Sequence, residues 1–417
     1  MTDPDAVLDA TVREEWGRLV ALLLARHRRL DLVEDALADA VEAAARAWPE
    51  QGVPHNPPAW LNTVANRRIL DQLRAEAIHQ RKVPQLVMDA TRPVPAEVMA
   101  DPGGLIEDEL LRLVLMCAHP ALAPEAAGAL ALRLVVGVST PDIARLFLVP
   151  ESTMAARITR AKKKIVSAGI PFAVPSEEDL PGRLDTVAQI GYLAFTAGYA
   201  PGSGPDLLRA ELAGTAIELI SVTDDLRGQD DPVLVSLRAL MGFQHSRRDA
   251  RVDAAGALVL LADQDRTRWH RDEIAAAHER LMSPALLGPM SPRAAAYTLQ
   301  ARIAAEHALA PSTAATSWSR IVSLYDLLLQ VMPGAPTEVA RAVAVAEERG
   351  PAAGLEALGP ITWAGSHRLP AVRADLLARL GDTDAARSAY DTAIDLCRNE
   401  TELAHLRARR DSLDGSG

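Results

Sequence analysis

Hydrophobic residues recur at helical spacing from the start of the chain. Five of them, at positions i, i+4, i+7, i+8 and i+11, form one stripe of an amphipathic helix: Val12, Trp16, Leu19, Val20 and Leu23. The same period continues through most of the sequence, and the segments that interrupt it are rich in proline and glycine. The pattern therefore predicts a chain built from amphipathic helices.

A second helix is predicted from Leu30 to Ala47, and its two faces differ. Alanine, leucine and valine at helical spacing form the inner face, and the outer face has no basic residue before Arg46. An acidic face of this kind is most often simply solvated, but it also suits docking on a basic partner surface. The acidic residues assigned to the outer face are Asp31, Glu34, Asp35, Asp39 and Glu42.

The segment Pro49–Pro58 contains four prolines and a glycine, which predicts a loop because proline removes a helical hydrogen bond. A basic helix is expected from Ala59 to about Ala77, and Trp48 and Trp60 flank the loop. Tryptophans at helix ends are usually core anchors. Aromatic rings beside a basic groove also suit single-stranded DNA, because bases stack on them while cations neutralise the phosphates. The candidates on this helix are Trp60, Asn62, Arg67, Arg68 and Arg74.

Residues 83–104 lack a sustained period and are rich in Pro, Gly and Asp, which predicts a flexible linker. Helical spacing resumes in residues 105–168, with helices expected over Asp108–Cys117 and Pro124–Val136. Residues 139–165 then have the spacing of a helix-turn-helix. Ser139 or Thr140 can cap a first helix, and Pro150 prepares the start of a second helix at Glu151.

The second helix of a helix-turn-helix enters the DNA major groove with its N-terminal end. Residues 151–166 carry five basic residues against one acidic residue, although an ordinary hairpin with a solvated basic face remains an alternative. Residues near the helix start would contact base edges, and later ones would contact phosphates. The base-edge candidates are Glu151, Ser152, Thr153, Ala156 and Arg157, and the phosphate candidates are Arg160 and the run Lys162, Lys163 and Lys164.

Residues 181–417 form a long run of Ala- and Leu-rich amphipathic helices joined by short turns. The segment Leu376–Leu396 has a helix, a glycine-centred turn and a second helix, which resembles one tetratricopeptide repeat, and Arg341–Leu358 has a looser form of the same pattern. We therefore expect an all-α protein with a C-terminal helical, tetratricopeptide-like extension.

Composition and charge narrow the function classes. The 417 residues are 49% hydrophobic but only 4% aromatic, which favours helices over sheets. The net charge is −11, and residues 1–170 carry 20 basic against 22 acidic residues, while residues 171–417 carry 24 against 33. Basic faces that could meet a polyanion are thus concentrated in the first part. Two distant cysteines and the absence of a long apolar run predict a cytoplasmic protein without a membrane partner.

Metal and catalytic interpretations have little support in the sequence. Cys117 and His119 lack a second ligand pair at zinc spacing, so a packed helix end explains them better. Asp263, Asp265 and Arg266 form a charged cluster without a nucleophile or a phosphate loop, which favours structural ion pairing and capping. We expect no metal, no cofactor and no catalytic residues, and hence no enzyme.

The order of acidic helix, Pro-rich loop with Trp, basic helix, linker and helix-turn-helix resembles the extracytoplasmic-function (ECF) group of sigma-70-class RNA polymerase sigma factors. DLVEDALADAVEAAARAW resembles the region 2 helix that clamps the polymerase, and NPPAWLNTVANRRILDQLR resembles the helix that recognises and melts the −10 element. LRLVVGVSTPDIARLFLVPESTMAARITRAKKKI resembles region 4, which reads the −35 element.

Further stretches resemble one branch of that group, which has a long C-terminal helical extension related to tetratricopeptide repeats. They include LMCAHPAL, GIPFAVP, LADQDRTRW and LPAVRADLLARLGDTDAARSAYDTAIDL. Two positions depart from the family pattern. Ala38 stands where the clamp helix commonly has Gln, and Thr196-Ala197 stands where the branch typically has Asn-Glu before Gly-Tyr.

The resemblance implies four parts: region 2 over residues 10–82, a linker over 83–104, region 4 over 105–170 and a regulatory extension over 181–417. The acidic residues would bind core RNA polymerase. The loop with Trp60 would hold a flipped −10 base, and region 4 would bind −35 DNA. The extension would modulate activity and could bind a regulatory protein. A polymerase-independent helix-turn-helix regulator with a ligand- or protein-binding helical domain remains an alternative, as does a protein-binding scaffold. Neither requires the pairing of acidic and basic helices.

Overall fold

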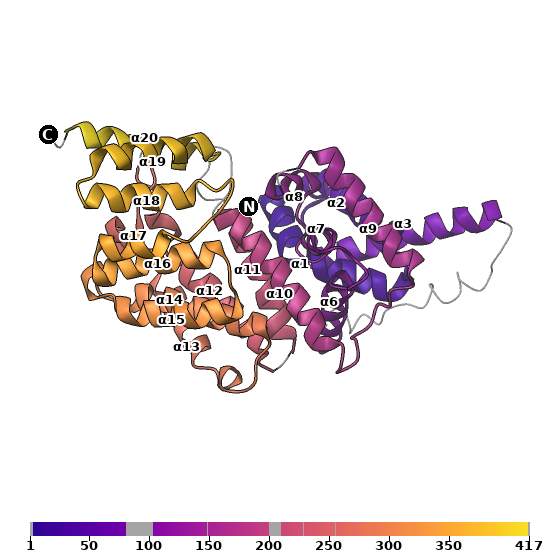
Figure 1. The fold of residues 1–417 in the computed structure, drawn as a ribbon. Helices are drawn as coiled ribbons and strands as arrows, with labels where there is room; N and C mark the ends of the chain where they lie inside the picture. Colours follow the sequence, from indigo (N-terminus) through magenta and orange to yellow (C-terminus); the bar gives the residue numbers. More distant parts are fainter. Residues whose placement is uncertain are drawn as a thin grey trace. The chain divides into compact units, whose positions relative to one another are not determined.

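The computed structural model describes residues 3–80, 103–147, 149–199, 210–227, 229–254 and 256–415 (Figure 1). Apart from an isolated β-bridge between Val252 and Leu258, the regular structure of these residues is helical. The all-α prediction is therefore confirmed. The chain divides into two compact units, one formed by residues 1–191 with 225–228 and the other by 192–224 with 229–417. The predicted linker lies outside the described residues up to position 102, and Gly103 and Gly104 already belong to a helix.

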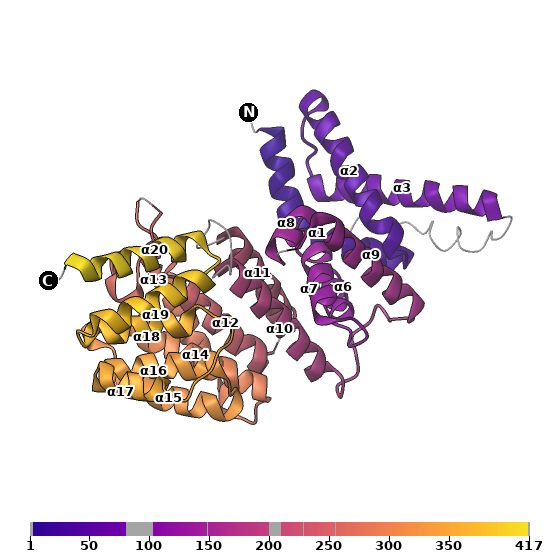
Figure 2. The ribbon, with the colours of Figure 1, turned by 45° about the horizontal axis from the view of Figure 1, so that its top comes forward.

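The first unit begins with a three-helix bundle (Figures 1 and 2). Its first helix starts after Asp3, whose side chain accepts a hydrogen bond from the Asp5 amide, and ends at Arg28 in the left-handed conformation. Leucine, alanine and tryptophan side chains from all three helices form the core. The helices of the bundle are α1 (Pro4–His27), α2 (Leu30–Gln51) and α3 (Pro57–Gln80).

The loop prediction for Pro49–Pro58 was too long. Helix α2 continues through Pro49 to Gln51 and ends at Gly52, which has a positive φ of 85°. Helix α3 begins at Pro57. A proline near the end of a helix removes only one amide donor, and a proline in the first turn replaces an amide that has no helical partner. The loop is therefore confined to residues 52–56.

Four more helices complete the first unit, and α1 packs against α6 and α7 of this group. The Trp16 indole Nε1 donates a hydrogen bond to the Arg133 carbonyl oxygen over 3.0 Å. The start of α10 also belongs to this unit, because the Arg183 guanidinium donates to the Leu115 carbonyl oxygen over 3.1 Å. These helices are α6 (Gly103–Cys117), α7 (Pro124–Leu134), α8 (Thr140–Leu146) and α9 (Glu151–Ser167), followed by α10 (Leu180–Tyr199).

The second unit consists of further helices, in which neighbours along the chain pack side by side. Three successive apolar clusters lie between α14, α15 and α16, between α16, α17 and α18, and between α18, α19 and α20. From α14 to α20 the helices therefore pack mainly on their sequence neighbours, whereas α12 packs extensively on α14 across the intervening α13. The helices are α11 (Ala210–Arg227), α12 (Pro232–His245), α13 (Arg271–Leu281), α14 (Pro292–Leu309), α15 (Trp318–Val331), α16 (Ala335–Arg349), α17 (Pro351–Leu358), α18 (Arg368–Arg379), α19 (Thr383–Leu396) and α20 (Glu400–Asp411).

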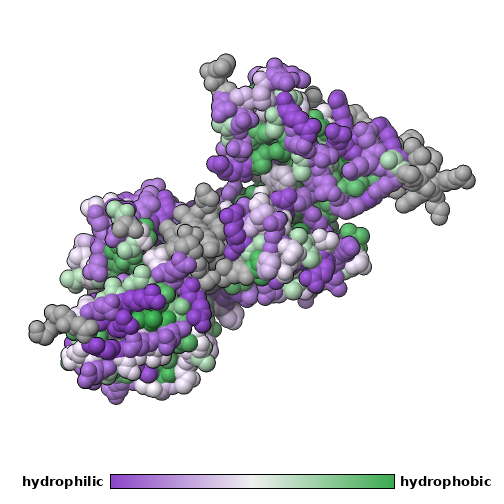
Figure 3. Space-filling model, turned by 90° about the horizontal axis from the view of Figure 1, so that it is seen from above, coloured by the Kyte–Doolittle hydropathy of each residue, from purple (hydrophilic) through white to green (hydrophobic). Residues whose placement is uncertain are grey.

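Short 3-10 helices complete the second unit: η1 (Arg248–Ala250), η2 (Leu261–Asp263), η3 (Arg266–Arg268), η4 (Pro284–Leu287), η5 (Thr313–Ala315) and η6 (Ser412–Gly415). The face drawn in Figure 3 is mostly hydrophilic, with small apolar areas between the polar side chains. Among the helices of the described residues, none combines the length and the hydrophobicity that a membrane crossing requires.

A close approach between Gly137 and Trp16 predicts a strong stability effect. Gly137 has a φ of +80°, and a Cβ atom added there would lie 2.9 Å from Cγ of Trp16. We expect Gly137→Ala to lower the free energy of unfolding by about 2–4 kcal/mol, since left-handed strain and overpacking add. Gly52→Ala is the matched control, because Gly52 has a similar φ of +85° with open space around it. Urea unfolding of both full-length variants measures the difference, and equal losses would contradict the proposed contact with Trp16.

Candidate nucleic-acid interface

Helices α8 and α9 form the predicted helix-turn-helix. The Ser139 hydroxyl accepts a hydrogen bond from the Asp142 amide and caps α8. Ile143 and Ala144 are buried where α8 meets α9. Helix α9 starts at Glu151, as predicted, and continues to Ser167, two residues beyond Ile165. Its inner side is the buried stripe Met154, Ile158, Ala161 and Ile165.

The outer side of α9 presents most of the candidate DNA-binding residues together. Arg157 is half-buried, because its guanidinium lies over the Phe147 ring, 5.9 Å from the centroid. Lys162 is the other candidate that is not exposed. The remaining candidates lie on one solvent-facing surface with a strong excess of positive charge, which suits contact with a nucleic-acid backbone. They are Glu151, Ser152, Thr153, Ala156, Arg160, Lys163 and Lys164.

The two tryptophans beside the loop differ in exposure. Trp48 is 2% exposed and anchors the core, while Trp60 is half-buried. Their rings meet edge to face, with centroids 5.7 Å apart. Trp60 is thus held by a rigid partner and keeps part of its ring accessible. This geometry supplies one pre-positioned ring for stacking at the start of α3.

Helix α3 presents its basic residues to solvent. Arg67 and Arg68 are exposed, and Arg74 is exposed but forms an ion pair with Asp71 at 3.0 Å. Asn62 is half-buried one turn from the helix start. The structure therefore brings these candidates onto the same helix as Trp60. Arg74 contributes less net positive charge than the sequence suggested, because its partner offsets it.

The acidic residues of α2 fall into three groups. Asp35 and Asp39 are exposed, and neither has an ion pair or hydrogen bond with another described residue. Asp31 binds Arg29 at 2.7 Å, and this guanidinium holds the pKa of the Asp31 carboxyl below its ordinary value. Glu42 forms an ion pair with Arg46, one turn further along. Glu34, by contrast, is not on the outer face.

The assignment of Glu34 to the outer face was wrong, because this residue is buried at 7% exposure. Its carboxylate binds Arg133 Nε of α7 at 2.5 Å and also pairs with Lys162 of α9. Burial raises the pKa of Glu34, but Lys162 and Arg133 outweigh this effect and hold the pKa below its ordinary value. These three residues, here called the Glu34 triad, connect α2 to the helix-turn-helix region.

Sequence signals for the Glu34 triad exist but are weak. Glu34 stands four residues after Leu30 and three before Leu37, so it falls within the buried stripe of α2. Arg133 is the only basic residue of helix α7, whose remaining residues are apolar apart from Glu125 in the first turn. Its guanidinium also lies 5.5 Å from the Trp16 ring centroid and donates to the Val138 carbonyl oxygen over 3.2 Å. A charged residue at a position that faces the core is usually paired with an opposite charge. The sequence therefore indicated that such residues needed partners, but not which partners they had.

The charged cluster predicted around Asp265 is a cap rather than an ion pair. The Asp265 side chain accepts hydrogen bonds from the Thr267 amide and hydroxyl and caps η3. Arg266 instead donates to the carbonyl oxygens of His307 and Ala310, over 2.7 and 2.8 Å. The capping prediction is therefore confirmed, and the ion-pair prediction for Arg266 was wrong.

Potential metal ligands come together at one place that the sequence did not reveal. Among the described residues, His367, Cys397 and Glu402 have their ligand atoms within 4.8 Å of one another. His367 binds Glu402 at 2.9 Å, and Arg368 lies 3.8 Å from the same carboxylate. Because Glu402 already binds His367 and lies near Arg368, the cluster is explained as a polar network between the start of α18 and α20. Cys117, the other candidate, is buried, which raises its pKa to about 12.

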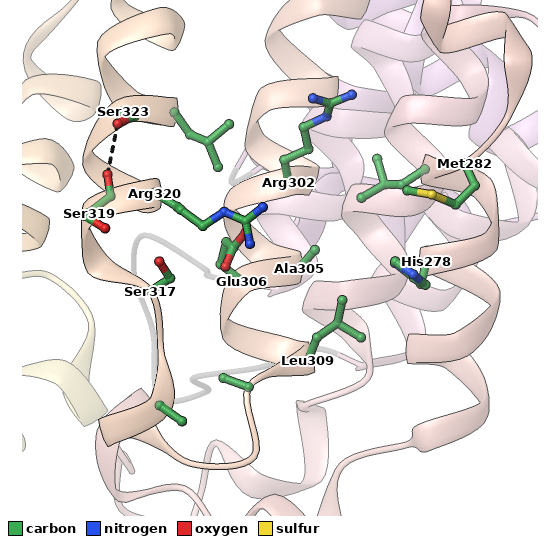
Figure 4. A pocket seen from close by; sticks show the side chains of 14 residues that line it. His278, Met282, Arg302, Ala305, Glu306, Leu309, Ser317, Ser319, Arg320 and Ser323 are labelled. Atoms are coloured by element: carbon green, nitrogen blue, oxygen red, sulfur yellow. Dashed lines mark hydrogen bonds and ion pairs between the residues drawn. The ribbon is translucent and has the colours of Figure 1, made fainter.

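A groove of about 770 Å³ lies between α13, α14 and α15 in the second unit (Figure 4). Apolar side chains such as Leu281 and Leu309 line part of it. Its rim carries Arg302 and the ion pair between Arg320 and Glu306, whose charged atoms lie 3.4 Å apart. An apolar surface with a few charged groups is the usual composition of a groove that binds a ligand or a peptide.

Comparison with known protein families matches three segments of the chain. Residues 12–78 match Sigma-70 region 2, and residues 112–165 match Sigma-70, region 4. Residues 183–285 match a family of unknown function, DUF6596. The chain is also similar to the Uncharacterized protein R00370 of Rhizobium meliloti (strain 1021). The two are 38% identical over 420 residues, which cover 99% of this chain and 97% of that protein.

Proposed function

Because this chain belongs to one family with the Rhizobium meliloti protein and is a sigma-70-class factor, we propose that it binds core RNA polymerase and directs promoter-specific initiation as an ECF-type factor. The observation that most directly supports polymerase binding is the pair Asp35 and Asp39 on α2. Both carboxylates are exposed and free of partners among the described residues, and they lie one turn apart on the same face of the helix. Such a surface is ready to bind a basic partner.

Helix α3 and its preceding loop supply the −10 function in this proposal. Trp60, fixed against Trp48, would stack on an extruded base, and the exposed Arg67 and Arg68 would neutralise phosphates of the opened strand. Asn62 and Arg74 lie on the same helix and would add polar contacts. The protein performs no catalysis in this scheme, and it acts in the cytoplasm together with the polymerase.

Helix α9 supplies the −35 function. Ser152, Thr153 and Arg157 near its start would meet base edges, and Arg160 with Lys163 would meet phosphates. The solvent-facing placement of most of these side chains supports the proposal. The Glu34 triad opposes it in one respect, because Lys162 is occupied by Glu34.

The Glu34 triad therefore belongs to a closed state in this proposal. The −10 and −35 elements are about 25 base pairs apart, or ~85 Å along B-DNA. Helix α3, with 24 residues, is only ~36 Å long, and α9 is shorter. Regions held together by direct contacts of Glu34 cannot span both elements. They must separate before the promoter is bound.

The C-terminal unit is proposed to modulate this activity. The groove between α13, α14 and α15 supports a role in binding a regulatory protein or ligand, because its apolar lining is open to solvent. The alternative function, a helix-turn-helix regulator that acts without polymerase, is supported by the same α8–α9 geometry. It leaves the free carboxylates of Asp35 and Asp39 without a role.

Multi-round transcription with purified core polymerase tests the proposal on the DNA upstream of the protein's own gene. We expect a discrete transcript that depends on the full-length protein. A footprint by the protein alone, without core binding and without a transcript, would instead favour the polymerase-independent regulator.

A single lysine on α9 offers a quantitative test of DNA contact. Lys163 is exposed, so Lys163→Ala should weaken binding to all DNA sequences alike and reduce the slope of log K against log salt by about 1. Arg13→Ala, which removes an exposed charge on α1, should leave that slope unchanged. Fluorescence anisotropy with a labelled duplex at several salt concentrations measures both. An unchanged slope for Lys163→Ala would exclude its phosphate contact.

A further inference from the structure

The C-terminal end of α10 meets a segment about fifty residues later in the sequence. The Arg247 guanidinium donates a hydrogen bond to the Tyr199 hydroxyl over 2.9 Å. Arg251 donates to the Tyr199 carbonyl oxygen, and its guanidinium carbon lies 3.9 Å from the centroid of the Tyr199 ring. Two arginines thus converge on one tyrosine, one at its hydroxyl and one at its ring face.

A second ring holds a third arginine in the same neighbourhood. Trp269 is 3% exposed, and the Arg266 guanidinium lies 4.4 Å from its ring centroid. Arg247 approaches the same ring at 5.9 Å. Arg247, Arg251 and Arg266, together with the rings of Tyr199 and Trp269, are here called the arginine–aromatic cluster.

The carboxylates around this cluster have other partners. Arg247, Arg251 and Arg266 form no ion pair with a carboxylate of the described residues, and their N–H groups donate to carbonyl oxygens and to a hydroxyl. Glu273 binds His245 and Arg248, and Glu402 binds His367. Among the described residues, Glu402 therefore offsets Arg251 only in part, while Arg247 and Arg266 act on each other as like charges.

The charges of the arginine–aromatic cluster also affect the pKa of a neighbouring histidine. The pKa of His307 is lowered to about 4, chiefly by burial and also by the charges of Arg247 and Arg266. Burial also lowers the pKa of Arg251, as does the charge of Arg247. Like charges held this close in a partly dehydrated place are costly unless an anion binds between them. Residues 171–417 carry 24 basic against 33 acidic residues, so the convergence of three arginines stands out against an acidic background.

Ring stacking also prepares these guanidiniums for binding. A guanidinium that lies over an aromatic face keeps its N–H groups in the plane of the group, where they can grip two oxygens of a carboxylate or phosphate. We propose that the arginine–aromatic cluster is a binding site for a small oxyanion ligand with several ionised oxygens. Phosphate and carboxylate groups share this chemistry. The inference does not depend on the proposed role in transcription.

Titration calorimetry of the full-length protein with pyrophosphate and with citrate, at constant ionic strength, tests the proposal. We expect saturable binding of at least one of them, and the two probes distinguish a phosphate ligand from a polycarboxylate. Arg247→Gln should weaken that binding about tenfold or more, because it removes a charge-assisted contact. Arg407→Gln, which removes an exposed arginine of α20 in the same unit, is the matched control and should bind like the wild type.

A second readout separates ligand binding from a structural role of Arg247. If the charge is uncompensated in the free protein, Arg247→Gln should leave the ligand-free melting temperature unchanged or raise it. The pKa of His307, followed by NMR, should rise from about 4. A lower melting temperature would show that Arg247 is structural. Absence of saturable binding of both probes to the wild type, or equal weakening by the two variants, would overturn the proposal.

Discussion

Exchanging Asp35 and Asp39 for arginine should abolish association with core RNA polymerase and leave the helix bundle folded. Both side chains are exposed on α2, and neither has a partner among the described residues. The free protein therefore loses no contact, whereas a complex loses two attractive charges and gains two repulsive ones. Such a change at an interface costs several kcal/mol, so we expect affinity to fall about 100-fold or more. Binding of labelled protein to core polymerase measures this directly.

The matched control is the pair Asp9→Arg and Glu14→Arg. Both residues are exposed acids on α1, and the double variant changes the net charge by the same amount. If the two double variants lose affinity equally, only the overall charge matters and the α2 surface has no special role. Thermal unfolding checks that both variants keep the wild-type fold. Retained binding by Asp35→Arg/Asp39→Arg would remove the observation on which the proposed polymerase contact rests.

Much of the architecture could be predicted from periodicity and capping residues. The start of α9 at Glu151 and the cap at Ser139 followed from local chemistry, because proline and serine near a helix start act through neighbouring backbone atoms only. The loop at Pro49 was drawn too long for a related reason. Proline restricts the backbone strongly, but a helix tolerates it in the last turn when the rest of the helix is packed.

Tertiary ion pairs were much harder to predict. Glu34 was assigned to the outer face because charged residues are rarely buried without a partner. Its partners lie 99 and 128 positions away in sequence, on α7 and α9, and no local pattern relates them. The arginine–aromatic cluster escaped prediction in the same way, since Tyr199 and Trp269 become neighbours of the same arginine only through the fold.

The Glu34 triad predicts a measurable opening of the first unit. Glu34→Gln keeps the size of the side chain but leaves Arg133 and Lys162 without their anion, at positions where the three side chains are 9%, 20% and 23% exposed. Breaking a buried pair in this way should weaken the contact between α2 and the helix-turn-helix by about 2–4 kcal/mol. Glu42→Gln, which breaks an exposed ion pair on the same helix, should change the free energy of that contact by less than ~0.5 kcal/mol.

The measurement is energy transfer between a dye on the exposed side of α3 and one on the exposed side of α9. We expect lower transfer efficiency for Glu34→Gln than for Glu42→Gln or the wild type. Since the closed state must open before a promoter is bound, polymerase that carries the Glu34→Gln variant should also associate faster with promoter DNA, because the substitution removes the cost of opening. Unchanged transfer would show that the triad does not hold the two regions together.

The contact between Glu34 and the helix-turn-helix should also depend on pH. The pKa of Glu34 lies below its ordinary value of 4.5 in the folded protein, so the ionised carboxylate stabilises the closed state. That stabilisation is complete above pH 4.5 and is lost as the pH falls through the lowered pKa of Glu34. The reason is that an unpaired Glu34 carboxylate takes up a proton more readily than the paired one. Wild-type transfer efficiency should therefore decrease at acidic pH. Glu34→Gln should show a smaller decrease over the same range, since it has no proton to take up at this position.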